Sequence, residues 1–71
     1  MAAQILAHIT GTVWKIETRV GAQIQEGDVV VILESMKMEM PVEATASGTV
    51  TAVLVKEGEA VNEEQPLVEL G

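Results

Sequence analysis

The chain has 71 residues, enough for one domain whose small core contributes only a few kcal/mol of net stability. It contains no cysteine and one histidine, so neither disulfide bonds nor a zinc cluster can add to that stability. The formal net charge of −7 repels phosphate backbones and anionic lipid, which disfavours nucleic-acid and membrane-surface roles.

Apolar residues follow the two-residue period of β-strands along much of the chain. They alternate over residues 5–9 and 38–44, and the run Val29–Leu33 is continuously apolar. Because proline cannot donate a hydrogen bond to a sheet, Pro41 and Pro66 should lie at an edge or with the ring nitrogen toward solvent. Glycines separate the strands at the short intervals typical of small all-β barrels and sandwiches, at Gly11, Gly21, Gly27, Gly48 and Gly58.

The two halves of the chain resemble each other. A shift of 37 positions brings Gly11 onto Gly48 and matches the halves along their whole length without a gap. The chain therefore divides into residues 1–34, the joint Ser35–Lys37 and residues 38–71. Since each copy needs a partner to cover its apolar face, this repeat predicts one domain with pseudo-two-fold symmetry.

The joint between the halves is predicted to form the tip of a β-hairpin. Strands 29–34 and 38–44 would pair across a two-residue turn at Met36-Lys37, with alternate pairs on the same face. Such turns favour Asn-Gly or Asp-Gly because their central residues have positive φ, so a Met-Lys turn suggests that these side chains serve another purpose. In this register Leu33/Met40 and Val31/Val42 share one face, whereas Glu34/Glu39 and Val30/Glu43 share the other.

Lys37 would then be an exposed amine at a strained tip. A lysine side chain in water is almost entirely protonated at neutral pH, so this amine alone would be a poor nucleophile. It would need an enzyme that deprotonates it and presents an activated acyl group. Composition alone favours a solubilising turn residue, since single surface charges are common. An interaction module with an incidental lysine is another alternative, and an enzyme is a weaker one.

The segment around Lys37 resembles a known attachment motif. Residues 34–42, Glu-Ser-Met-Lys-Met-Glu-Met-Pro-Val, are similar to the biotinylation motif of biotin carboxyl carrier domains, in which a lysine between two methionines accepts biotin. The resemblance extends over residues 1–71 as a single biotin/lipoyl attachment domain. It includes the related segments Gly11-Thr12-Val13 and Gly48-Thr49-Val50.

The resemblance implies an all-β fold, a flattened β-barrel of two four-stranded antiparallel sheets known as a barrel-sandwich hybrid, with Lys37 opposite the termini. It implies that biotin protein ligase joins biotin to the Lys37 ε-nitrogen. The domain, itself not an enzyme, would carry carboxylate between biotin carboxylase and carboxyltransferase, and tethering would raise the effective concentration at each site. Recognition by the ligase or a partner is assigned to Glu34, Ser35, Met36, Met38 and Glu39.

Lipoate is the rival group, because lipoyl carriers share the fold and the exposed lysine. Lipoyl domains usually present Asp-Lys-Ala at the tip, so Met-Lys-Met favours biotin, and small attachment proteins of this type can accept both. Residues 7–11 lack the prolines and methionine of larger carriers, which leaves the carboxylase open. We expect a domain that is monomeric by itself and cytoplasmic, and we assign Trp14, Ile16 and Val53 to packing.

Overall fold

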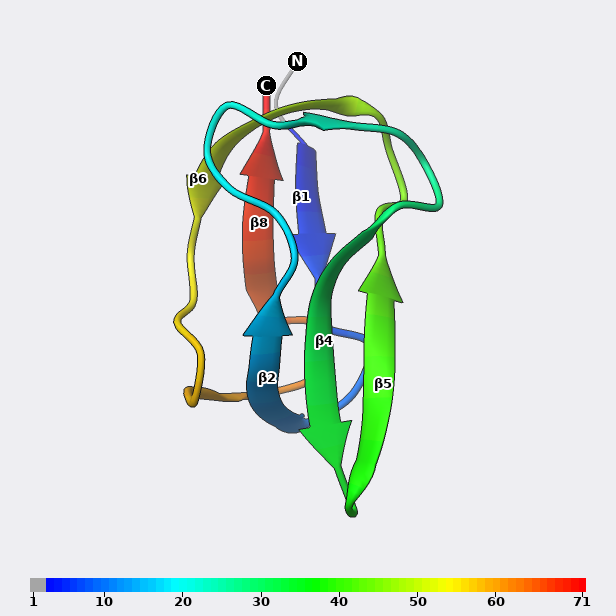
Figure 1. Ribbon diagram of the computed structural model, residues 1–71, viewed down its shortest axis with the longest axis vertical. Coiled ribbons are helices and arrows are strands. Elements are labelled where there is room, and N and C mark those ends of the chain that lie inside the picture. The colour runs from blue at the N-terminus through cyan, green and yellow to red at the C-terminus, as the bar shows by residue number, and fades with distance from the viewer. Residues whose placement is uncertain (1–2) are drawn as a thin grey trace.

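The computed structural model describes residues 3–71, and within them the chain forms eight β-strands (Figure 1). In this described part there is no helix long and apolar enough to cross a membrane. In chain order the strands are β1 (Ala3–Leu6), β2 (Gly11–Ile16), β3 (Gln23–Ile24), β4 (Val29–Ser35), β5 (Met38–Glu43), β6 (Gly48–Val53), β7 (Ala60–Val61) and β8 (Pro66–Leu70).

The strands form two four-stranded antiparallel sheets that face each other. The strand order is β1-β8-β6-β3 in one sheet and β5-β4-β2-β7 in the other. The molecule is elongated, with extents of 34 × 19 × 18 Å. The predicted fold, a flattened barrel of two four-stranded antiparallel sheets, is confirmed.

The pseudo-two-fold symmetry is present at the level of single hydrogen bonds. A shift of 37 positions converts β1–β4 into β5–β8 and exchanges the two sheets strand for strand. The Val13 N–H donates to the Glu59 carbonyl at 2.8 Å, and at the equivalent place the Val50 N–H donates to the Ala22 carbonyl at 2.9 Å. Each sheet contains strands from both halves, so neither half can complete its sheet alone.

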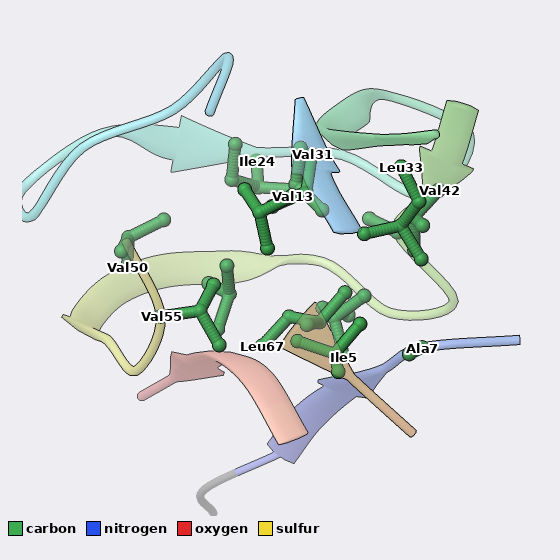
Figure 2. Close-up of a cluster of buried hydrophobic side chains, with 14 of the residues drawn as sticks. Ile5, Ala7, Val13, Ile24, Val31, Leu33, Val42, Val50, Val55 and Leu67 are labelled. Atoms are coloured by element: carbon green, nitrogen blue, oxygen red, sulfur yellow. The ribbon is translucent and has the colours of Figure 1, made fainter. Parts of the chain in front are cut away.

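The core between the sheets is aliphatic. No polar or charged side chain is buried among the described residues, which means that stability comes from packing of branched apolar side chains. Figure 2 shows these side chains directed from both sheets into the space between them. The buried residues are Ile5, Ala7, Val13, Ile24, Val30, Val31, Leu33, Val42, Ala44, Val50, Val55, Val61, Leu67, Val68 and Leu70.

A β-bulge corrects the predicted pairing at the start of β4. Glu43 pairs with Val29 instead of Val30, and the register shifts between Val29 and Val31. The extra residue lets consecutive side chains turn inward, so Val30 and Val31 are both 0% exposed. The prediction that Val30 lies on the outer face was therefore wrong, because the bulge interrupts the regular alternation of side chains within this apolar run.

Five other residues can be compared with their predicted positions. Pro41 lies on the edge strand β5, as predicted, whereas Pro66 is the first residue of the inner strand β8, another position where a sheet tolerates proline. Trp14 is 46% exposed, so its assignment to packing was wrong. It is the unpaired residue at a second bulge, between Val13 and Lys15 of β2. Ile16 and Val53 do pack against the core.

Candidate functional site

The β4–β5 hairpin places Lys37 at one extreme end of the molecule. Figure 1 shows this tip at the bottom of the view, while the C-terminus and the start of β1 lie at the opposite end. The ladder pairs Ser35 with Met38 and continues in the predicted register as far as Val31 and Val42. The predicted two-residue turn is confirmed.

The turn has the backbone conformation that two-residue hairpins require. Met36 has a φ of 52° and Lys37 a φ of 64°, which are the left-handed values of a type I′ turn. A residue other than glycine pays about 1–2 kcal/mol for this conformation. The pairing of Ser35 with Met38 leaves only two residues to reverse the chain, and this fixes the left-handed conformation of Met36 and Lys37.

The hairpin is rigid almost to its tip. Strand β4 is hydrogen-bonded to β2 on one side and to β5 on the other. Leu33 is 0% exposed in the core, and its partner Met40 is partly buried. Gly11 allows β2 to approach closely, since a Cβ at this position would lie 2.6 Å from the Glu34 carbonyl oxygen. The amine is therefore presented from a fixed backbone.

Two exposed methionines lie on either side of Lys37 in the sequence. Met36 is 91% exposed and Met38 is 60% exposed, so neither fills the core. Lys37 between them is exposed as well, whereas Ser35 is half-buried. Exposed methionines carry a flexible apolar surface that adapts to a partner, and this pair surrounds the amine.

The charges beside the turn leave the lysine unpaired. Glu34 and Glu39 lie opposite each other in the ladder, and both are exposed. The only salt bridge within residues 3–71 joins Lys15 to Glu17 at 3.4 Å, so no described carboxylate lies within 4.0 Å of the Lys37 Nζ. The structure thus brings together all six predicted site residues, with Ser35 the least accessible of them.

Other candidate chemistry is sparse in the described part of the chain. Residues 3–71 contain no group of three or more histidine, cysteine, aspartate or glutamate side chains arranged to hold a metal. Three shallow surface hollows are lined by residues outside 34–40, and they lie away from the turn. A prosthetic group joined by an amide would fit the tip. The Lys37 amine is exposed and unpaired, and the turn that carries it projects from the end of the molecule.

The similarities to known proteins agree with this site. Residues 1–70 match the family described as "Biotin-requiring enzyme". The chain belongs to the biotin/lipoyl attachment domain family, whose members are carriers. Family membership implies a covalently attached biotin or lipoate.

Two small relatives and one large solved structure illustrate the family. The "Biotin/lipoyl attachment protein" of Bacillus subtilis (strain 168) is 50% identical over 62 residues, which cover 87% of this chain and 85% of the relative. The "Biotinylated protein TB7.3 homolog" of Mycobacterium leprae (strain TN) is 44% identical over 61 residues, or 86% of each chain. The urea carboxylase of Kluyveromyces lactis matches with a TM-score of 0.92 and 37% identity, covering 100% of this chain but only 6% of its own.

Proposed function

We propose that this protein is a biotin carrier, modified on Lys37 by a biotin protein ligase and serving a biotin-dependent carboxylase. One observation carries the proposal: an exposed, unpaired lysine stands at a rigid turn between two exposed methionines. The names of the biotinylated relative and of the urea carboxylase support the same reading for this chain.

The domain's part in the chemistry is to hold and present an amine. Once a ligase has removed one proton from the Lys37 ammonium group, the nitrogen forms a bond to the carbonyl carbon of an acyl adenylate. Adenylate leaves with the electron pair of the bond that breaks, and the nitrogen gives up a second proton to become the amide N–H. The type I′ turn keeps the amine clear of the sheet, so a ligase can close around it. Biotin, when attached, supplies the capacity to carry carboxylate from one active site to another.

Tethering gives the carrier its advantage over free biotin. A group fixed to Lys37 meets each active site at the effective concentration that the complex sets, instead of the concentration in solution. A biotin carboxylase and a carboxyltransferase are the proposed partners. The domain itself contributes binding and position, and we propose no catalytic step for it.

Lipoate is the second candidate, supported by the name of the Bacillus subtilis relative. The methionines on both sides of Lys37 favour biotin. Mass spectrometry of the intact protein, produced in separate cultures with a biotin ligase or a lipoyl ligase, tests the choice. We expect a biotin-sized increment that maps to Lys37. A lipoyl-sized increment without a biotin-sized one would reverse the preference.

We also propose that residues 1–71 act as one domain, monomeric by itself, in the cytoplasm. The net charge of −7 supports a monomer, because copies of this chain repel one another. Light scattering at several protein concentrations tests the monomer, and fractionation of the native cells tests the location.

Replacing Met36 with asparagine should stabilise the fold and slow modification. Asparagine tolerates positive φ better than methionine, so we expect the free energy of unfolding to rise by about 1 kcal/mol and Tm by about 4–8 °C. The ligase would lose an apolar contact, and acceptance should slow severalfold. Thermal unfolding and initial rates of biotinylation measure the two effects. A fall in Tm with normal acceptance would show that the methionine supports the fold instead.

A further inference from the structure

The two bulges of the inner strands β2 and β6 occupy equivalent positions but carry different side chains. Trp14 is the extra residue in β2 opposite Ile32, and Thr51 is the extra residue in β6 opposite Glu69. Positions related by the pseudo-two-fold axis share a backbone environment. Since threonine satisfies this bulge in one half of the molecule, the fold does not require an indole in the other.

The outer face of the β1-β8-β6-β3 sheet carries polar groups that bond to one another. The Gln4 Nε2 donates to the Glu69 Oε2 at 3.3 Å, and the Thr51 Oγ1 donates to the Glu69 carbonyl at 3.3 Å. These three residues form a row across the sheet at its bulge. This row has the character expected of a sheet face that remains in water.

The equivalent row on the tip-bearing sheet is apolar. A shift of 37 positions replaces Gln4, Glu69 and Thr51 by Pro41, Ile32 and Trp14. Pro41 is exposed, Ile32 is half-buried and Trp14 is 46% exposed. Trp14 is also the only aromatic residue of the chain, and tryptophan is one of the residue types enriched in the energetic centres of protein interfaces.

The charges next to this row indicate the chemistry of a partner. Glu34 and Glu39 form the next outward-facing pair toward the tip, and neither makes a salt bridge in the described structure. Lys15, at the bulge itself, is already paired with Glu17. A partner would therefore meet an apolar strip bordered by free carboxylates. Arginine fits both features, since its guanidinium binds carboxylates and stacks on indole rings.

The row is close enough to Lys37 to lie under the same partner. Ile32 is five positions from Lys37 along the hairpin, which is about 16 Å at the rise of an extended strand. A standard interface buries about 800 Å² on each partner, equivalent to a disc of roughly 16 Å radius. A protein that closes on the turn can thus contact the row as well.

We propose that Trp14, Ile32 and Pro41 form a docking face for the ligase that modifies Lys37, and that the ligase meets it with an apolar pocket rimmed by arginine or lysine. The proposal rests on the proposed function, because the ligase is the protein that must close around the turn. This docking face would contribute to the affinity of the domain for the ligase, while the amide bond would form at the Lys37 amine.

The Trp14→Thr variant tests this face, because it installs the side chain that the symmetry-related bulge already uses. We expect kcat/KM for biotinylation to fall about tenfold, as for a tryptophan inside the contact area, with Tm changed by less than about 4 °C. The matched control is Leu54→Glu. Leu54 is 44% exposed beyond β6, and its symmetry-related residue is Glu17, so the control also exchanges an exposed apolar residue for its counterpart.

A binding measurement separates docking from modification. The single tryptophan of the Lys37→Arg variant gives one indole N–H signal in a ¹H–¹⁵N spectrum, and we expect unlabelled ligase to shift or broaden it. Unchanged kcat/KM in Trp14→Thr together with an unperturbed indole signal would overturn the proposal, and would point to a carboxylase subunit or a second copy as the occupant. Failure of the proposed function looks different, since wild-type protein would then remain unmodified at any ligase concentration.

Discussion

Replacing Lys37 with arginine should abolish covalent attachment and leave the fold intact. Arginine keeps the charge and a similar length, but its guanidinium remains protonated and does not form the amide. The turn should tolerate the change, because the side chain is exposed and makes no salt bridge in the described structure. Mass spectrometry after incubation with biotin, ATP and biotin protein ligase should show no increment, and Tm should stay within about 4 °C.

The other two lysines provide matched controls. Lys15 is exposed at the bulge of β2 and Lys56 is exposed after β6, so they offer the same amine in different surroundings. Lys15→Arg and Lys56→Arg should both be modified to completion. Residual biotin on the Lys37→Arg variant would mean that accessibility alone selects the amine, and the role assigned to the turn would have to be abandoned.

Much of the site follows from local sequence because a hairpin is a local structure. The strand pattern on both sides of residues 35–38 places a two-residue turn at Met36-Lys37, and the alternation of side chains then determines which residues face outward. The register alone does not expose Met38, because it places Met38 on the same face as Met40 and Val42; Met38 is exposed because it lies beyond the end of the core, and Met36 because it lies in the turn. The position of the tip opposite the C-terminus was implied by the family resemblance, and the structure agrees with it.

The bulges are the part that local pattern could not predict. A bulge depends on how one strand fits two neighbours at once, and β2 and β4 are both inner strands. The apolar run at Val29–Leu33 gave one usable signal, because strict alternation cannot place Val30 and Val31 on the same face. No comparable signal existed for Trp14, where a large aromatic residue in a small domain is normally buried.

The interlocked sheets explain how so small a core can hold a rigid tip. Each half supplies two strands to each sheet, so the hairpin cannot loosen without disturbing strands from the other half. The same symmetry places two glycines, Gly11 and Gly48, where the inner strands β2 and β6 begin. The backbone atoms next to these two glycines differ: the Glu34 carbonyl oxygen is nearest to Gly11, and the Gly71 carbonyl oxygen is nearest to Gly48. Substitution of the two glycines should therefore change stability by different amounts.

Gly11→Ala should destabilise the domain far more than Gly48→Ala. A Cβ on Gly11 would lie 2.6 Å from the Glu34 carbonyl oxygen, which belongs to a strand paired on both sides and cannot easily move. Overpacking of this kind costs about 1–3 kcal/mol, and we expect about 2 kcal/mol and a fall in Tm of about 8–16 °C.

At Gly48 the nearest atom would be the Gly71 carbonyl oxygen at 3.1 Å. A shift of a few tenths of an ångström relieves a contact of this length, and Gly71 lies just beyond the end of β8. Alanine also recovers about 0.5–1 kcal/mol of the entropy that glycine loses in a strand. We therefore expect Gly48→Ala to be nearly neutral by thermal or urea unfolding. An equal loss of stability in the two variants would contradict this explanation. It would show that glycine is needed at the first position of both inner strands, and not for the close approach of β2 to the base of the hairpin. Support for the tip would then depend on the core contacts of Leu33 and Val42 alone.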